Sequence, residues 1–370
     1  MKVLVTGSNG FIGRNLCVTL ENREDMEVLR FDVGQSLDDL KALCGEADFI
    51  FHLAGVNRPE NVEEFQTGNL GLTETLLSIL EEQRRFVPVV LSSSTQALLD
   101  NPYGVSKRQA EERIFEWGRK NGVPVIVYRF PNVFGKWCRP NYNSVVATWC
   151  HAIARGEAIR IDDPKKTLTL VYIDHVVAEL LKAMEGHPTL DAEGFGVVPV
   201  SFQVTLADLA RRLQAFRDSR DTLLLPDSAD LFDKCLYATY LSYLPETGLA
   251  YDLFTRDDPR GSLAEFLKSP HCGQMFVSRT KPGITRGHHW HHTKVEKFLV
   301  VEGEAEIRFR RVGQDEMVSY TVSGEKWRVV DIPPGTTHSI TNTGTRDLVT
   351  LFWANEILDP ENPDTYRLEV

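Results

Sequence analysis

The first thirteen residues restrict the fold more than any other stretch of the chain. An apolar run from Lys2 to Thr6 leads into Gly-Ser-Asn-Gly-Phe-Ile-Gly at 7–13, and leucines at helical spacing follow at Leu16 and Leu20. This order predicts a buried strand, a glycine turn and a helix. Glycines let the backbone turn tightly and approach a pyrophosphate closely, and the helix N-terminus faces that anion. We therefore expect a dinucleotide-binding unit whose cofactor residues include Gly7, Asn9, Gly10, Phe11, Ile12, Gly13 and Arg14.

The composition is that of a globular protein and limits its partners. The chain has 370 residues, 42% hydrophobic and 25% charged, enough for two domains. The net charge of −11, without blocks of like charge, argues against nucleic acid or an anionic membrane as partner. No apolar run reaches membrane-span length and no signal peptide precedes the first strand, so we expect a cytoplasmic protein. The six cysteines show no CxxC spacing and are expected to be reduced.

A tyrosine and a lysine stand four residues apart in Asn-Pro-Tyr-Gly-Val-Ser-Lys at 101–107. Pro102 is suited to open a helix, on which Tyr103 and Lys107 share a face. The neighbouring cation is expected to lower the pKa of the phenol and make the pair an acid/base unit. The apolar run at 87–91 precedes three serines at 92–94, which places hydroxyls at the carboxyl end of a strand, where open α/β sheets bind ligands.

Charged residues after the second expected strand, 27–31, bear on the cofactor. An acidic residue at this strand end binds the adenosine ribose hydroxyls, whereas an arginine accepts a 2′-phosphate. Arg30 and Asp32 are both present, and we favour Arg30, assisted by Arg14, because a guanidinium fork suits a phosphate. The predicted cofactor is therefore NADPH. The next buried strand, 49–55, ends in small residues over which the cofactor could lie, and we expect Leu53 and Ala54 to contact it.

Four of the ten histidines fall in Gly-His-His-Trp-His-His at 287–292. On a strand, His289 and His291 would point to the same face. Glu296 follows five residues after His291, and His338 comes later in Pro-Pro-Gly-Thr-Thr-His at 333–338. Two imidazoles at i and i+2, a carboxylate and a third imidazole suit one divalent metal. Zinc is the first expectation, although the spacing also allows iron, nickel or manganese.

The sequence changes character near residue 250. Before this point, amphipathic patterns predict helices at 145–155, 174–184, 205–218 and 230–241. From Asp252 on, short β-branched and aromatic runs separated by glycine and proline indicate a small β-barrel or sandwich. We expect a first domain at 1–250 and a second at 251–370.

The first domain resembles the extended, nucleotide-sugar-modifying branch of the short-chain dehydrogenase/reductase superfamily, on its glycine spacing and its Ser/Tyr/Lys arrangement. The resemblance implies a Rossmann-type doubly wound parallel sheet, with Ser94, or alternatively Ser93, as the serine that hydrogen bonds the carbonyl oxygen. It also implies that Lys107 holds the cofactor ribose as well as tuning Tyr103. The Arg-x-x-Asn-x-x-Gly segment at 129–135 resembles the substrate segment of that branch, which implies Arg129 and Asn132 at the substrate.

The second domain resembles the cupin superfamily, on Gly-x5-His-x-His-x4-Glu-x6-Gly at 283–303 and Pro-x-Gly-x-x-His-x3-Asn at 333–342. The resemblance implies an all-β cupin barrel that binds its metal through His289, His291, Glu296 and His338.

The whole chain resembles the CapF family of bacterial capsular polysaccharide enzymes. The resemblance rests on the pairing of the two domains and on exact runs at 53–59, 134–138 and 140–145, the last of which contains Asn143, implied at the substrate. It implies a homodimer joined largely through the cupin, acting in the synthesis of UDP-N-acetyl-L-fucosamine. The cupin would epimerise C3 of a UDP-2-acetamido-2,6-dideoxy-4-hexulose, and the first domain would reduce the C4 ketone with NADPH to UDP-2-acetamido-2,6-dideoxy-L-talose.

Two other functions stay open. The first is a nucleotide-sugar 4-epimerase or dehydratase with a structural cupin, although a dehydratase needs two carboxylates near the serines and residues 98–100 offer only Asp100. The second is a non-catalytic NADP-sensing regulator, against which the intact Ser94, Tyr103 and Lys107 argue. The spacing also leaves open which cupin residue is the epimerisation base and whether the metal is catalytic or structural.

Overall fold

The computed structural model describes all 370 residues, which divide into two compact units. The first unit comprises Met1–Leu213 and Cys235–Leu244, and the second comprises Gln214–Lys234 and Pro245–Val370. The second unit thus begins close to the predicted boundary but also takes in a segment, 214–234, that the prediction assigned to the first domain. No helix is long and apolar enough to cross a membrane.

A five-stranded parallel sheet, in the order β2-β1-β3-β4-β5, is the centre of the first unit. Its strands are β1 (Lys2–Thr6), β2 (Glu27–Phe31), β3 (Phe49–His52), β4 (Val89–Ser94) and β5 (Val125–Phe130). The strand order reverses between β1 and β3. Doubly wound sheets bind ligands at such a reversal, outside the carboxyl ends of the strands. The predicted Rossmann-type sheet is therefore confirmed.

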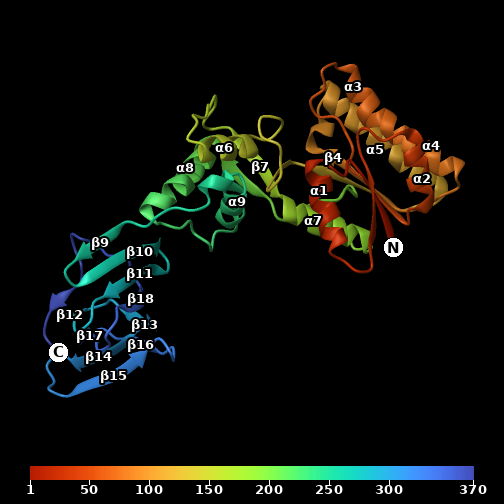
Figure 1. Cartoon of the computed structure of the whole chain (residues 1–370). Coiled ribbons are helices and arrows are strands. Elements are labelled where there is room, and N and C mark those ends of the chain that lie inside the picture. Colours follow the sequence, from red (N-terminus) through yellow and green to blue (C-terminus); the bar gives the residue numbers. More distant parts are fainter. The chain divides into compact units, whose positions relative to one another are not determined.

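Helices cover both faces of this sheet. One face packs against α2 (Leu37–Glu46), α4 (Leu72–Glu82) and α5 (Pro102–Asn121), and the other against α1 (Phe11–Glu21) and α7 (Ile173–Met184) (Figure 1). Within β1, Leu4 packs into the first core while Val3 and Val5 pack into the second. Successive strand residues point to opposite faces, so a strand buried on both sides is apolar throughout.

The first unit also contains a small second sheet, further helices and several short helical turns. That sheet has the order β6 (Asn132–Phe134), β7 (Thr167–Tyr172) and β8 (Phe202–Thr205). The helices here are α6 (Val145–Ala154), α8 (Leu206–Thr222) and α9 (Leu231–Leu241), each close to a predicted range. The part of α8 from Gln214 on and the first residues of α9, up to Lys234, belong to the second unit. The short helical turns of the first unit are α3 (Glu63–Phe65), a π-helical turn at Gln66–Gly71 and a 3-10 turn at Thr95–Leu98; another 3-10 turn, at Glu246–Gly248, belongs to the second unit.

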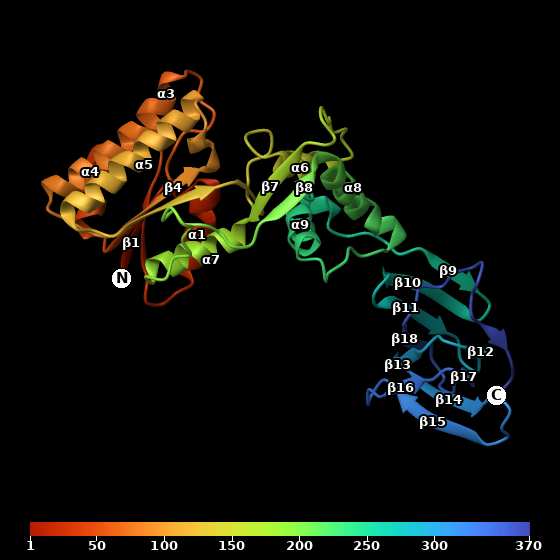
Figure 2. The same ribbon diagram turned by 180° about the vertical axis from the view of Figure 1, so that it is seen from behind.

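Two mostly antiparallel sheets make up the second unit (Figure 2). One has the order β16 (Val329–Ile332), β13 (Glu296–Glu302), β18 (Leu348–Ala354), β11 (Gly273–Thr280), β10 (Gly261–Ser269) and β9 (Thr255–Asp258). The other has the order β15 (Met317–Ser323), β14 (Glu304–Arg311), β17 (Thr336–Asn342), β12 (Thr285–Trp290) and β19 (Tyr366–Arg367).

A single apolar core, with Phe298, Ile307, Ile340 and Phe352 among its members, combines side chains from both sheets of the second unit. No strand pair joins the two sheets, so backbone hydrogen bonding does not close them into a barrel. The prediction of a C-terminal β domain is confirmed, while the closed barrel implied by the cupin resemblance is not formed by the strand pairing.

Candidate active sites

The glycine turn lies where the sheet order reverses and is packed too closely for side chains. Gly7 has φ +68°, and a Cβ there would lie 2.8 Å from the Ala54 Cα. A Cβ on Gly13 would lie 2.0 Å from the carbonyl oxygen of Gly7. The turn therefore brings the N-terminus of α1 against the residues that follow β3, Leu53 and Ala54, as a pyrophosphate site requires.

Arg30 does not occupy the position expected of a phosphate-binding residue. It lies within β2, and its guanidinium pairs with Glu21 at 2.8–2.9 Å. Asp32 stands at the strand end, where its two carboxylate oxygens accept backbone N–H bonds from Asn9 at 2.5 Å and Val33 at 2.7 Å. Arg14 is exposed and stacks on the Trp137 ring at 4.6 Å, without a carboxylate partner. The cation available beside the glycine turn is therefore Arg14.

The helix that carries Tyr103 and Lys107 begins as the sequence predicts. Pro102 is its first residue, and the Asn101 side chain caps it by accepting the Gly104 N–H at 2.8 Å. Proline in the first turn loses no hydrogen bond, and an asparagine cap satisfies a free N–H, so both residues fix the start of α5. Tyr103 and Lys107 then lie one turn apart on the same helix.

Burial, not the neighbouring cation, decides the protonation of Tyr103. Desolvation raises the pKa of the Tyr103 phenol, and the Ser94 hydroxyl only partly opposes it. The expected lowering by Lys107 is therefore wrong for the protein without cofactor. Burial also lowers the pKa of Lys107 to about 8, while the charge of Glu111 acts in the opposite direction. At neutral pH the phenol is a proton donor and the lysine is a cation.

The surroundings of Lys107 include Asn69 and Gly55, which the sequence interpretation did not place in the site. The Lys107 ammonium donates to the carbonyl of Ser92 at 3.2 Å. The side chain of buried Asn69, in the π-helical turn, accepts the backbone N–H of Val56 and donates to the Val56 carbonyl. It also donates to the Ser106 hydroxyl at 3.0 Å. A Cβ on Gly55 would come within 2.9 Å of the Lys107 Nζ, so only glycine leaves room for the ammonium there.

Ser93 and Arg129 belong to a buried ion-pair network instead of the open end of the sheet. Glu111, one turn after Lys107, accepts the Ser93 hydroxyl at 2.5 Å and two guanidinium nitrogens of Arg129 at 2.6 and 3.0 Å. The Arg129 guanidinium also stacks on the Phe195 ring at 3.6 Å. These contacts leave Ser94 as the serine beside Tyr103. Spacing i, i+4, i+8 on one helix was the available signal for Glu111.

The other two expected substrate residues are exposed. Asn132 begins β6 and donates to the carbonyl of Thr169 at 3.3 Å, and Asn143 lies in the loop before α6. Both side chains thus have surface free for a ligand.

In the second unit, the four predicted metal ligands come together. The ligand atoms of His289, His291, Glu296 and His338 all lie within 4.8 Å of one another. His289 comes from β12, Glu296 begins β13 and His338 lies on β17, directly across from His289. His291, Glu296 and His338 are buried.

Strand alternation is not the reason that His289 and His291 converge. A bulge shifts the register of β12 between Gly287 and His289, and the strand ends at Trp290, so His291 lies in the following loop. His288, in the bulge, adopts φ +58°. A Cβ on Gly287 would lie 2.7 Å from the carbonyl of His338, which makes glycine necessary at this close approach.

The hydrogen bonds around the cluster leave nitrogen lone pairs facing one carboxylate oxygen. His291 Nδ1 lies 2.6 Å from the carbonyl of Asp364 and His338 Nδ1 lies 3.3 Å from that of Thr336, so each Nδ1 carries the proton. Their Nε2 atoms then stand 3.3 and 3.1 Å from the same Glu296 oxygen, and His338 Nε2 lacks a hydrogen bond of good geometry. Lone pairs at these distances repel unless a proton or a cation lies between them. The donor set therefore fits a divalent metal such as zinc.

The ionisation states of Glu296 and His289 also suit a metal site. Burial opposes ionisation of Glu296, but interaction with the imidazoles of His291 and His338, which can donate to its carboxylate only when Nε2 is protonated, holds its pKa well below the ordinary value. Burial and the neighbouring His338 lower the pKa of His289 to about 4, so this imidazole is neutral at pH 7. A neutral imidazole is the form that binds a metal or takes up a proton.

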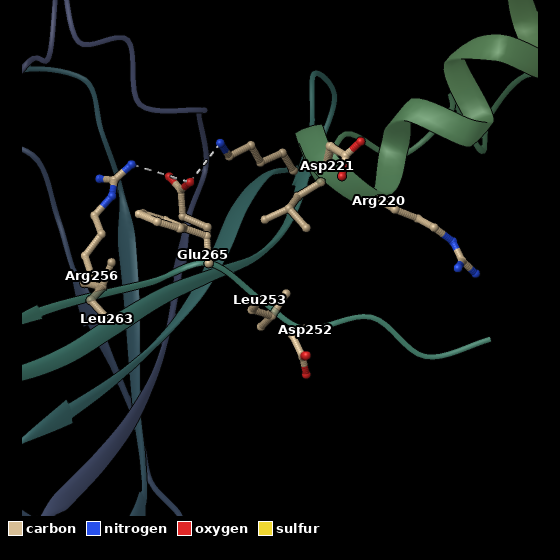
Figure 3. Close-up of a pocket in the computed structure, with 10 residues that line it drawn as sticks. Arg220, Asp221, Asp252, Leu253, Arg256, Leu263 and Glu265 are labelled. Carbon is tan, nitrogen blue, oxygen red and sulfur yellow. Dashed lines mark ion pairs between the residues drawn. The ribbon is translucent and has the colours of Figure 1, made fainter. Parts of the chain in front are cut away.

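A hollow of about 330 Å³ lies elsewhere in the second unit (Figure 3). Glu265 on its wall pairs with Lys268 at 3.0 Å and with Arg256 at 3.9 Å. None of the four cluster residues lines it. We assign no chemistry to this hollow.

Comparison with known proteins agrees with the two units. Residues 3–193 match the NAD dependent epimerase/dehydratase family, and residues 256–366 match the polysaccharide biosynthesis C-terminal domain. The chain belongs to the NAD-dependent epimerase/dehydratase family. It is also a close homologue of CapF: the structure of the capsular polysaccharide assembling protein CapF from Staphylococcus aureus is 49% identical with a TM-score of 0.94, and all of both chains is covered.

A curated relative supports the same placement. The UDP-2-acetamido-2,6-beta-L-arabino-hexul-4-ose reductase of Pseudomonas aeruginosa is 47% identical over 370 residues, covering 100% of this chain and 99% of that protein. A more distant structure, UDP-glucuronic acid 4-epimerase from Bacillus cereus, is 20% identical with a TM-score of 0.51 over 58% of this chain and 83% of its own, and shares the fold of the first unit alone. A nicotinamide cofactor follows from the family.

Proposed function

We propose that the chain is a bifunctional nucleotide-sugar enzyme whose two reactions take place in different units. The substrate is a UDP-2-acetamido-2,6-dideoxy-4-hexulose. The second unit inverts C3 and the first reduces the C4 ketone, giving UDP-2-acetamido-2,6-dideoxy-L-talose on the way to UDP-N-acetyl-L-fucosamine for capsule or O-antigen. The observation that carries this proposal is the presence of two separate reactive clusters, one in each unit. The names of the two full-length relatives, a hexul-4-ose reductase and a capsular polysaccharide protein, support the substrate.

The reduction follows from the protonation states in the first unit. A nicotinamide supplies a hydride to C4 when bound. Tyr103, whose phenol burial keeps protonated, donates its proton to the O4 atom as the carbonyl becomes an alcohol. Ser94 beside it orients the carbonyl oxygen, and the Lys107 cation favours the phenolate left behind. Of the carboxylates near the serines, Asp100 is exposed and pairs with Arg108 at 3.0 Å, and Glu111 is held in its ion pair with Arg129, which disfavours a dehydratase.

The epimerisation follows from the acidity of the C3 hydrogen. This hydrogen is α to the C4 ketone, so a base can remove it, and reprotonation from the opposite face inverts the centre. The base would be an imidazole of the cluster that is not bound to the metal at that step, and His289 is neutral at pH 7. His289, His291, Glu296 and His338 would hold the metal, and a divalent metal supplies Lewis acidity at a carbonyl oxygen.

NADPH is the cofactor that we propose for the first unit. Both carboxylate oxygens of Asp32 already accept backbone N–H bonds, and the bond from Asn9 ties the glycine turn to the end of β2, which favours a structural role over ribose recognition. Arg14, exposed at the start of α1, provides a cation for a 2′-phosphate. The Arg14 guanidinium lies over the Trp137 ring, and this cation–π contact holds it in position.

A homodimer through the second unit is also part of the proposal. β15 and β16 are edge strands of the two sheets, and both edges carry exposed apolar side chains, including Met317, Tyr320 and Val329, with Trp327 between them in sequence. Edge strands with exposed apolar side chains are prone to associate. In size-exclusion chromatography with light scattering, Trp327→Glu should lower the molar mass to that of one chain, whereas Leu37→Glu, an exposed control in the first unit, should leave it unchanged.

Isotope labelling separates the two reactions. The protein is incubated with the UDP-4-keto sugar and NADPH in deuterated water, and each deuterium is located by NMR. Tyr103→Phe should abolish NADPH oxidation but still exchange the C3 hydrogen. The double variant His291→Ala, Glu296→Ala should lose this exchange, whereas His271→Ala, an exposed histidine of the same unit, should retain it.

The decisive result is C3 exchange in Tyr103→Phe. If exchange disappears together with reduction in a folded variant, both steps share the first unit and the second unit has no epimerase role. If the double variant still exchanges C3 at the wild-type rate, the His/Glu cluster is not the epimerase site.

A further inference from the structure

The last residues of the chain lie across the strands that carry the His/Glu cluster. We call residues 359–370 the C-terminal strap. Its strand β19 pairs with His289 and Trp290 of β12, and the Leu368 N–H donates to the carbonyl of His288 at 3.0 Å. The Leu368 carbonyl in turn accepts the Thr337 hydroxyl of β17 at 2.5 Å. The strap thus contacts both strands that present histidines to the cluster.

Asp364 is the residue through which the strap holds the loop after His291. Its carboxylate accepts the backbone N–H groups of His292, Thr293 and Lys294 at 2.9, 2.9 and 3.1 Å, and the Thr293 hydroxyl at 3.0 Å. Its backbone is in the left-handed region, with φ +38°. Four donors on one carboxylate fix this loop against the strap, and the Lys294 ammonium adds a bond to the carbonyl of Pro363 at 2.9 Å.

The backbone of Asp364 also acts on a candidate metal ligand. Its carbonyl accepts the Nδ1–H of buried His291 at 2.6 Å, which directs the Nε2 lone pair to Glu296, 3.3 Å away. For His338 the equivalent acceptor is local, because Thr336 lies two residues away on the same strand. His291 sits in a loop and has no strand neighbour for this purpose. Its tautomer depends on a residue 73 positions later in the chain.

We propose that the strap is the positioning element of the metal centre, and that Asp364 sets metal affinity by holding the 292–294 loop and fixing His291 with its proton on Nδ1. The inference rests on the proposed metal site and adds a residue outside the ligand set. Groups that orient metal-bound imidazoles change metal affinity by 10- to 100-fold when they are removed. Asp364 is a positioning residue, since it contacts Nδ1 of His291 and not the nitrogen that would bind the metal.

The test compares Asp364→Ala, Asp364→Asn and Glu361→Ala in the full chain. Glu361 lies in the same strap, is exposed, and its N–H bonds only Asp359 of that strap. Zn²⁺ affinity is measured by competition with a chromophoric chelator on metal-stripped protein. We expect Asp364→Ala to bind Zn²⁺ 10- to 100-fold more weakly, Asp364→Asn to lose less because its amide oxygen still accepts hydrogen bonds, and Glu361→Ala to match the wild type.

A second measurement is independent of metal and of catalysis. Long-range ¹H–¹⁵N correlation spectra of metal-free, ¹⁵N-histidine-labelled protein report the tautomer of each imidazole. The wild type should show His291 protonated on Nδ1. Asp364→Ala keeps the backbone carbonyl but frees the 292–294 loop from the carboxylate, so the carbonyl and His291 should no longer be held together and the single tautomer should be lost. If Asp364→Ala binds Zn²⁺ as tightly as the wild type and retains the tautomer, the role of the strap is refuted. If the wild type binds no Zn²⁺, the proposed metal centre is refuted instead, and the tautomer of His291 still tests its contact with Asp364. If Asp364→Ala does not fold, the same two measurements on Asp364→Asn decide.

Discussion

The Glu111–Arg129 pair offers the sharpest test of how the first unit is held together. Arg129 comes from β5 and Glu111 from α5, so their contact fastens the helix that carries Tyr103 and Lys107 to the sheet. The Glu111 side chain is 3% exposed and that of Arg129 is 21% exposed. Arg129→Met keeps the aliphatic stem but removes the cation. A buried carboxylate is then left with only the Ser93 hydroxyl as partner.

The expected loss of stability differs between the two partners because Glu111 is more deeply buried than Arg129. Removing one member of a buried ion pair costs about 3–5 kcal/mol, because the remaining charge is uncompensated. Arg129 is partly exposed, so solvent screening places Arg129→Met near the lower end, at about 3 kcal/mol. Glu111→Gln should cost about 1–2 kcal/mol, since the amide still accepts a hydrogen bond and the arginine can reach water. The double variant should be more stable than Arg129→Met alone.

Hydrogen exchange measured by mass spectrometry is the suitable assay. The chain has two units, so one melting temperature does not define the stability of either. The most protected peptides of β4 and β5 report global opening of the first unit. If the double variant loses as much free energy of unfolding as the two single variants together, then loss of Arg129 does not leave Glu111 as an uncompensated buried charge, and the reasoning is wrong. If Arg129→Met instead raises the KM for the keto sugar without loss of stability, the substrate role first expected for Arg129 is correct.

Three further outcomes are expected. In Gly55→Ala the new Cβ would crowd the Lys107 ammonium and the Asn69 amide, so kcat for reduction should fall at least tenfold while metal content, measured by atomic emission, stays at the wild-type level; an unchanged kcat would show that Lys107 has room to move. Because the pKa of Lys107 is lowered to about 8, its ammonium is lost as pH rises through that value, and kcat/KM for reduction should decline above about pH 8; a flat profile to pH 10 would contradict the requirement for a charged lysine. Arg14→Ala should weaken NADPH about tenfold or more in titration calorimetry, by loss of charge-assisted bonds, and leave NADH unchanged; equal loss for both would assign Arg14 to the pyrophosphate.

The sequence by itself determined the features that depend on neighbours in the chain. Strand, glycine turn and helix follow from residues 2–20, and proline with an asparagine cap sets the start of α5. Helical spacing puts Tyr103 and Lys107 on one face, and the change of pattern near residue 250 separates a parallel α/β unit from a β unit. These are local effects of backbone conformation and side-chain periodicity, which a linear pattern records.

Only the tertiary structure decided what each charged group meets. Arg30 was expected to bind the 2′-phosphate of the cofactor from its place near a strand end, but it pairs with Glu21. Burial reversed the expected pKa shift of Tyr103, because desolvation depends on the whole fold and not on a residue four positions away. Asp364 reaches His291 across 73 residues of chain. Partner choice and dielectric surroundings arise when distant segments pack together, and for that reason the pattern of residues could name the reactive groups but not their protonation or their supports.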